Sequence, residues 1–178
     1  MSTQLKAEII QSIIRQYDFN LAFAKKLVED LTNEQMTAKP YPGFENHPAF
    51  TLGHLVTGTV NLIEDLGGKA DIPDGWNELF LRKGPGDPRL PSDQTELYPA
   101  KEKLLKEFER QHDKLKEYLL ATEDHKLDEK IEWRFDSYMP TVMDVVLFMC
   151  TIHEAMHLGQ LSAWRRAMGL PSALGALR

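Results

Sequence analysis

Apolar residues recur every three or four positions in four segments of the chain, which is the spacing of amphipathic helices. We predict helices over residues 4–31, from about residue 48 to 66, from residue 99 onward, and from residue 140 to about 168. Prolines begin three of these segments, and glycines follow the second and the fourth, as is typical of helix ends. No convincing strand pattern is present. The sequence therefore predicts an all-α four-helix bundle that forms a single domain over residues 1–178.

Long connections join the second predicted helix to the third and the third to the fourth. The first connection, residues 67–99, contains five glycines and five prolines and is too long to be a simple turn. Its Trp76 and Phe80 indicate that it packs on the bundle, and long ordered connections often cover functional sites. The second connection contains Trp133, Phe135 and Tyr138. We expect a cleft beneath residues 67–99.

The fourth predicted helix is apolar on nearly every side. A helix without a polar face must be covered from more than one direction. The other helices of the bundle can cover one side, and a second copy of the chain is a candidate for another. The pattern therefore favours a homodimer.

Charge and composition narrow the possible partners. The chain has 27 acidic and 21 basic residues, a formal net charge of -6 and no cluster of Lys and Arg, which argues against binding to nucleic acid. We find no signal-peptide pattern and no apolar run near ~20 residues, so we expect a cytoplasmic protein without a membrane span. The single cysteine, Cys150, cannot form an internal disulfide, and we interpret it as a small buried apolar residue.

The most informative motif is His153-Glu154-Ala155-Met156-His157. Positions i and i+4 share one face of a helix, so both imidazoles can bind one metal ion. The same letters match the zincin signature, in which the glutamate is the general base. The chain after His157 contains no Asp, Glu or His, so the third ligand must lie upstream.

His54 is the best upstream candidate for the third ligand. It lies in the apolar run Leu52-Gly53-His54-Leu55, where Gly53 leaves space for a close approach. A buried histidine bonded to a backbone carbonyl is the alternative. A site formed by His54, His153 and His157 leaves one coordination position open, as catalytic zinc sites do.

The remaining histidines fit the site less well. His112 could be a fourth ligand, but we interpret it as a boundary residue among charged side chains. We expect His47 and His125 to be exposed to solvent.

Glu154 and Gln160 are the candidate catalytic residues. Glu154 could be a general base, or it could be a carboxylate at a helix or subunit interface. Gln160, one turn after His157, could bind a ring N–H or a substrate group, or it could form an ordinary interhelical hydrogen bond. Arg165 and Arg166 suit the end of a helix electrostatically, and one of them could instead hold an anionic substrate.

The stretch Leu52-Gly53-His54-Leu55, together with His153 to Leu161 and the following Arg165, Gly169, Leu170 and Pro171, resembles the DinB-like (YfiT-like) superfamily of metalloenzymes. The resemblance implies an up-down-down-up four-helix bundle that is frequently dimeric. It also implies a zinc or nickel ion held by His54, His153 and His157. Characterised relatives include S-transferases that use the thiols bacillithiol or mycothiol, and a mycothiol-dependent maleylpyruvate isomerase.

Two functional classes remain open at this point. The first is a metal-dependent enzyme acting on a small molecule: a low-molecular-weight thiol S-transferase, or a hydrolase that uses the same site. The second is a non-catalytic module in which the metal joins two helices and the protein acts through a binding partner or as a dimer in a stress response. An open coordination position would favour an enzyme, and a fourth protein ligand such as His112 would favour a structural role.

Overall fold

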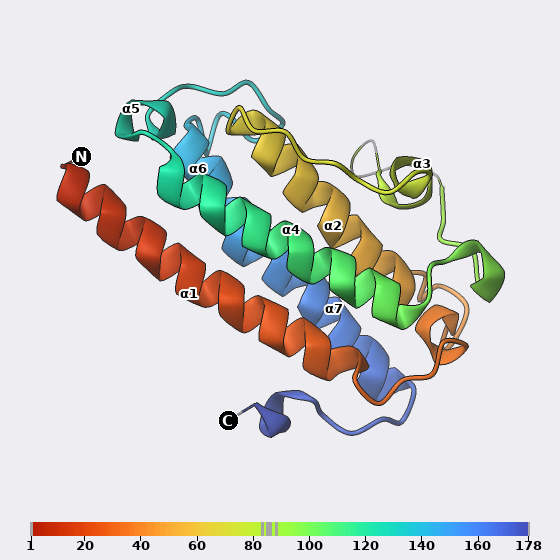
Figure 1. The fold of residues 1–178 in the computed structure, drawn as a ribbon. Helices are drawn as coiled ribbons and strands as arrows, with labels where there is room; N and C mark the ends of the chain where they lie inside the picture. The colour runs from red at the N-terminus through yellow and green to blue at the C-terminus, as the bar shows by residue number, and fades with distance from the viewer. Residues whose placement is uncertain (1, 83, 85–86, 88, 178) are drawn as a thin grey trace.

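The computed structural model describes residues 2–82, 84, 87 and 89–177. Four long helices form the bundle (Figure 1): α1 (Thr3–Val28), α2 (Pro48–Asp65), α4 (Lys101–Ala121) and a C-terminal helix made of α6 (Val142–Leu147), a π-helical turn (Phe148–His153) and α7 (Glu154–Ala167). α2 and α4 run in the same direction, opposite to α1 and α7, which is the up-down-down-up arrangement. The described residues contain no β-strand, so the prediction of an all-α bundle is confirmed.

Short helical segments occur in the connections. The predicted breaks are present, but the connections contain more ordered structure than the sequence indicated. These segments are η1 (Gln35–Thr37), α3 (Trp76–Phe80), η2 (Thr95–Leu97), α5 (Asp124–Leu127) and, after α7, η4 (Leu174–Ala176).

Local hydrogen bonds determine where the helices begin and end. Thr141 and Asp144 form a reciprocal capping box at the start of α6, so two free backbone N–H groups are satisfied. Gly67 and Gly169 have φ values of +83° and +72°, a backbone conformation that glycine adopts without steric cost, and they follow α2 and α7. The predicted ends of the second and fourth helices are therefore confirmed.

The sequence pattern suggested a regular C-terminal helix, but the helix in the structure is irregular. Its six residues Phe148–His153 form a π-helical turn directly before the second half of the helix. Such turns insert about one extra residue and change which side chains face the core. Cys150 and Glu154 are consequently the fully buried residues here, and His153 and His157 lie half-buried beside them.

Two apolar clusters fill the bundle, one toward each end. One includes Leu27, Leu52, Phe108 and Trp164, and the other includes Ile13, Leu62, Leu115 and Val146. On every helix, buried polar residues lie between the segments that contribute to the two clusters: Asn20, Thr57 and Thr59, Gln111 and His112, and Glu154. The bundle therefore contains a polar layer across its middle.

The outer side of the C-terminal helix remains uncovered in the single chain. Leu147, Ile152 and Met156 are 41%, 49% and 58% exposed. By length and composition alone, the stretch Val142–Ala167 qualifies as a candidate membrane span, which the sequence interpretation had not anticipated. It packs against α1 and α2, an arrangement that is compatible with a soluble bundle.

Candidate metal centre

Three histidines from two helices meet at the edge of the bundle. One ring nitrogen from each of His54, His153 and His157 lies within 4.8 Å of the corresponding atom of the other two. The ring centres are 5.6 Å apart for His54 and His153, 4.8 Å for His54 and His157, and 4.7 Å for His153 and His157. All three side chains are half-buried. The predicted convergence of these three residues is therefore confirmed.

A backbone carbonyl fixes the orientation of His54. Its Nδ1 lies 3.2 Å from the carbonyl oxygen of Phe80, which can only accept a hydrogen bond, so Nδ1 carries the proton. The lone pair is then on Nε2. Metal-ligating histidines commonly donate their second ring N–H in this way.

Close packing holds Phe80 in place beside α2. Its ring is fully buried and occupies the space above Gly53, where an added Cβ would overlap it. Trp76, also buried, packs against the Phe80 ring at 5.2 Å between centres. The expectation that Trp76 and Phe80 pack on the bundle is confirmed, and the short helix α3 forms a wall of the site.

The protonation states of the histidines suit a cation. Burial, together with the neighbouring His54, lowers the pKa of His153 to about 4. The same two causes, with a further contribution from His153, lower the pKa of His157 to about 3. Burial also lowers the pKa of His54. Each ring is therefore neutral at pH 7 and has a lone pair available.

These residues fit a divalent metal ion. Bonds of about 2.0–2.1 Å from zinc to imidazole place tetrahedral ligand atoms roughly 3.4 Å apart. The nitrogens here lie within 4.8 Å, so small rotations of the rings bring them into range. In the part of the chain that the structure describes, no Cys, Asp or Glu joins this group.

Gln160 lies beside His157 and contacts a segment outside the bundle helices. Its side chain raises the pKa of His157, and its Oε1 accepts a hydrogen bond of 3.3 Å from Asn46, in the segment before α2. Gln160 therefore links a candidate ligand to another part of the chain. The sequence gave no signal for Asn46, because the contact joins segments that are 114 residues apart.

Glu154 points into the core of the bundle, toward α4. It is 2% exposed, and its Oε1 lies 2.8 Å from Nε2 of His112. Burial raises the pKa of Glu154 and lowers that of His112, so the neutral forms of both are favoured. The zincin arrangement, in which Glu154 acts beside the metal, does not fit this geometry. The carboxylate lies inside one bundle, between helices α7 and α4.

Two predictions about the other histidines are wrong. His112 is fully buried, stacked on the ring of Tyr17 at 3.6 Å between centres, and is not a boundary residue. His47 is also fully buried: Nε2 donates to the carbonyl of Ser92 at 2.8 Å, and Nδ1 accepts from the N–H of Phe50 at 3.2 Å. His47 thus caps α2 and anchors the long connection. His125 is exposed, as predicted.

The arginines at the end of α7 have separate environments. Arg165 is 3% exposed and forms two hydrogen bonds with Asp30, at 2.6 and 2.9 Å. Its guanidinium is thereby committed to the fold. Arg166 is exposed and contacts Ser162.

The two long connections meet near the site. A Cβ on Gly84, in the first connection, would overlap the guanidinium of Arg134, in the second. Trp133 and Phe135 of the second connection surround Phe148, whose ring centre is 6.2 Å from that of His153. The histidines therefore have an aromatic group on one side and α3 on another.

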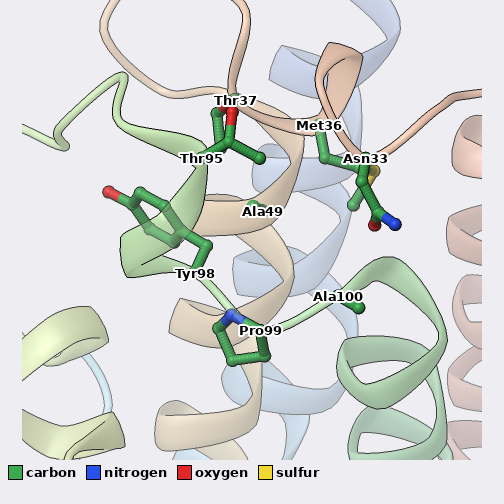
Figure 2. A pocket seen from close by; sticks show the side chains of 8 residues that line it. All are labelled: Asn33, Met36, Thr37, Ala49, Thr95, Tyr98, Pro99 and Ala100. Atoms are coloured by element: carbon green, nitrogen blue, oxygen red, sulfur yellow. Dashed lines mark hydrogen bonds between the residues drawn. The ribbon is translucent and has the colours of Figure 1, made fainter.

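A separate hollow of about 210 Å³ lies where η1, η2 and the start of α4 meet α2 (Figure 2). Its polar groups include Thr37 and Thr95, whose hydroxyls hydrogen-bond to each other at 2.7 Å. It is lined by Asn33, Met36, Thr37, Ala49, Thr95, Tyr98, Pro99 and Ala100. None of these is a strong metal ligand, so this hollow is distinct from the three-histidine group.

Comparisons with known proteins agree with the fold. The model of the DinB superfamily matches residues 16–161. A solved structure, of a conserved protein from Enterococcus faecalis, is similar with a TM-score of 0.59 and 19% identity, covering 94% of this chain and 97% of that one. At this identity the likeness concerns the fold alone. A search of curated proteins found no match.

Proposed function

The chain belongs to the DinB superfamily, and from this membership and its three histidines we propose that it is a metal-dependent enzyme that transfers a small electrophile to a low-molecular-weight thiol. The metal is zinc or nickel, held by His54, His153 and His157. The substrate is a small molecule, and the protein acts in the cytoplasm.

One observation carries the proposal. Three neutral, half-buried imidazoles converge, and no fourth His, Cys, Asp or Glu completes the group among the described residues. His112, the candidate fourth ligand, is bonded to Glu154 instead. This supports an enzyme with an open coordination position over a module in which the metal only joins helices.

His54, His153 and His157 would hold the ion, which would lower the pKa of a coordinating thiol and so supply a sulfur nucleophile at neutral pH. The residues of the chain prepare the site. The carbonyl of Phe80 orients His54, and Gln160 lies beside His157 and raises its pKa. Phe148 and its aromatic neighbours limit access of water on the side of His153.

The position of Glu154 favours a thiol over water as the nucleophile. A hydrolase needs a general base close to the attacking water. Glu154 is buried against His112, and no other carboxylate joins the histidine group in the described part of the chain. A thiol activated by the metal needs no such base, because its proton can leave to solvent.

Activity can be tested with a chloromethyl bimane reagent and a panel of thiols, before and after metal removal and reconstitution. The sulfur lone pair forms the new C–S bond, chloride leaves with the electrons of the C–Cl bond, and the thiol proton passes to solvent. We expect metal-dependent turnover with at least one thiol. Absence of metal-dependent turnover with every thiol would contradict the transferase assignment.

The homodimer belongs to the same proposal, and the uncovered outer side of the C-terminal helix supports it. Ile152 and Met156 expose apolar surface there. Sedimentation velocity should show a dimer that Met156→Glu shifts toward monomer. Leu97→Glu, at a residue that is 50% exposed in η2, is the control and should leave the dimer intact. A wild-type monomer at micromolar concentration would contradict this part.

A further inference from the structure

Arg82 lies beside the candidate metal centre in a fixed position. It follows α3 by two residues, and α3 is anchored by the buried Phe80, whose carbonyl holds His54. The Arg82 guanidinium lies 4.4 Å from the centre of the Phe50 ring. That ring is nearly parallel to the imidazole of His54, with 5.7 Å between centres. Arg82 and His54 therefore both lie against the Phe50 ring, and the charge of Arg82 acts on His54.

Arg82 forms no direct ion pair among the described residues, and the nearby Asp87 acts on its charge only through space. Its Nη1 donates to the carbonyls of Leu79 and Leu81, both at 3.2 Å. A guanidinium has five N–H donors, so the Nε and Nη2 edge remains available. By contrast, Asp87 pairs with the nearby Arg89, and Asp30 pairs with Arg165.

The guanidinium of Arg82 is partly removed from solvent, which favours binding of an anion. Arg82 is half-buried, and burial lowers its pKa. A partly desolvated cation that forms no direct ion pair gains from a further anionic partner, and the free edge of a guanidinium matches the two oxygens of a carboxylate. The charge of Arg82 also reaches His54, whose pKa it lowers.

From this geometry we propose that Arg82 binds the carboxylate of a small acidic thiol whose sulfur lies at the three histidines. The proposal rests on the proposed function and names the class of thiol, a mercapto acid. Arg82 is a positioning residue: it orients the thiol and does not contact the reacting atoms. The Phe50 ring supports the guanidinium from one face and leaves its edge free for the ligand.

The test uses the cobalt(II)-loaded protein and two probes of nearly equal shape, 3-mercaptopropionate and its neutral amide. Absorption from sulfur-to-cobalt charge transfer gives Kd for each. We expect the wild type to prefer the acid by about tenfold, the effect of one charge-assisted, two-point hydrogen bond at a half-exposed site. Arg82→Gln should bring the ratio close to one, and Arg82→Lys should give an intermediate ratio.

The control is Arg166→Gln, which removes the same charge from an exposed guanidinium on α7 that contacts Ser162. It should keep the preference of the wild type. A preference unchanged in Arg82→Gln, or lost equally in Arg166→Gln, would overturn the proposal. Elemental analysis checks that each variant retains cobalt. If Arg82→Gln does not retain it, the comparison of Arg82→Lys with Arg166→Gln decides, because lysine keeps the charge but cannot form the two-point hydrogen bond and should lower the ratio.

A third probe separates this proposal from the thiol function. Butyrate carries the carboxylate without sulfur, and cobalt broadens its proton resonances when it binds nearby. Broadening that depends on Arg82 supports the carboxylate site. If that broadening is seen and no thiol binds, only the transferase assignment is contradicted. Broadening that is the same in the wild type and Arg82→Gln overturns the carboxylate site, whatever the thiols do.

Discussion

Adjacent residues of one helix enter two different environments in this protein. His153 lies at the edge of the bundle with His54 and His157, where the three rings keep their lone pairs. Glu154, the next residue, is buried and bonded to His112 in the polar layer. The three edge histidines, here called the edge group, have free ligand capacity. The interior pair, Glu154 and His112, is joined by one hydrogen bond, while His112 Nδ1 and Glu154 Oε2 have no hydrogen-bond partner among the described residues. The comparison indicates that the edge group could hold a metal ion, as we propose, and that the interior pair links α7 to α4.

The largest effect should come from removing a ligand of the edge group. His157→Ala or His54→Ala should reduce bound metal from about one ion per chain to near zero, because two imidazoles rarely retain a catalytic ion that uses three protein ligands. Elemental analysis after dialysis measures this. Asn46→Ala, which removes a contact of Gln160, is the control and should keep the metal. Unchanged stoichiometry in both histidine variants would refute the site.

Substitutions in the interior pair, Glu154 and His112, should lower stability and leave metal binding unchanged. Glu154→Ala leaves neutral His112 buried without its partner and should lower the free energy of unfolding by about 1–3 kcal/mol, measured by urea denaturation. Glu154→Gln keeps a neutral hydrogen bond and should cost only about 1 kcal/mol. Both variants should still bind about one metal ion per folded chain. A zincin-type loss of all activity in Glu154→Gln, with metal and fold intact, would show that Glu154 acts in catalysis.

The contrast between these regions was only partly visible in the sequence. The three histidines were predictable because His153 and His157 are one helical turn apart and His54 lies in an apolar helix. The burial of Glu154 was not, because the π-helical turn changes the facing of the helix after Phe148. The letters of the motif are the same in a regular helix and in this one.

Hydrogen bonds to residues far away in the sequence explain the wrong predictions for His47 and His112. His47 is buried by a bond to Ser92, 45 residues away, and His112 by a bond to Glu154, 42 residues away. Neither partner can be chosen from local sequence. Arg82 was missed for the same reason, since its proximity to His54 depends on how the long connection folds back on α2. Gly53 was the one local sign of that close approach.

A smaller effect should follow when α3 is displaced from the edge group. The Cβ of Gly53→Ala would overlap the Phe80 ring, and moving that ring weakens the bond from His54 to the Phe80 carbonyl. We expect a loss of about 1–3 kcal/mol in stability and about tenfold in metal affinity. Competition with a chromogenic chelator measures the affinity.

Gly159→Ala is the matched control for this substitution. It lies on the exposed side of α7, with no atom within 4 Å of an added Cβ. It should leave metal affinity unchanged and raise stability by up to about 1 kcal/mol, because alanine favours the helix. Equal effects of the two glycine substitutions would show that the contact with Phe80 is unimportant.

The last predicted effect concerns the metal-free protein alone and is a change in the pH dependence of its stability. The pKa of His157 is about 3 when folded, below its ordinary value of 6.5, so below about pH 6.5 the unfolded chain binds the extra proton. Stability should therefore fall as pH decreases from about 6.5 toward the folded pKa. His157→Gln should reduce that slope by about 1.4 kcal/mol per pH unit between pH 6 and 4. An unchanged slope would contradict the burial of a neutral His157.

X-ray absorption spectroscopy of the metal-loaded protein tests the central claim most directly. The account predicts about three imidazole nitrogens at roughly 2.0–2.1 Å around zinc and one further position that changes when a thiol is added. It also predicts that His54→Ala abolishes this spectrum. A coordination sphere without three imidazoles, or one that His54→Ala leaves unchanged, would contradict the account.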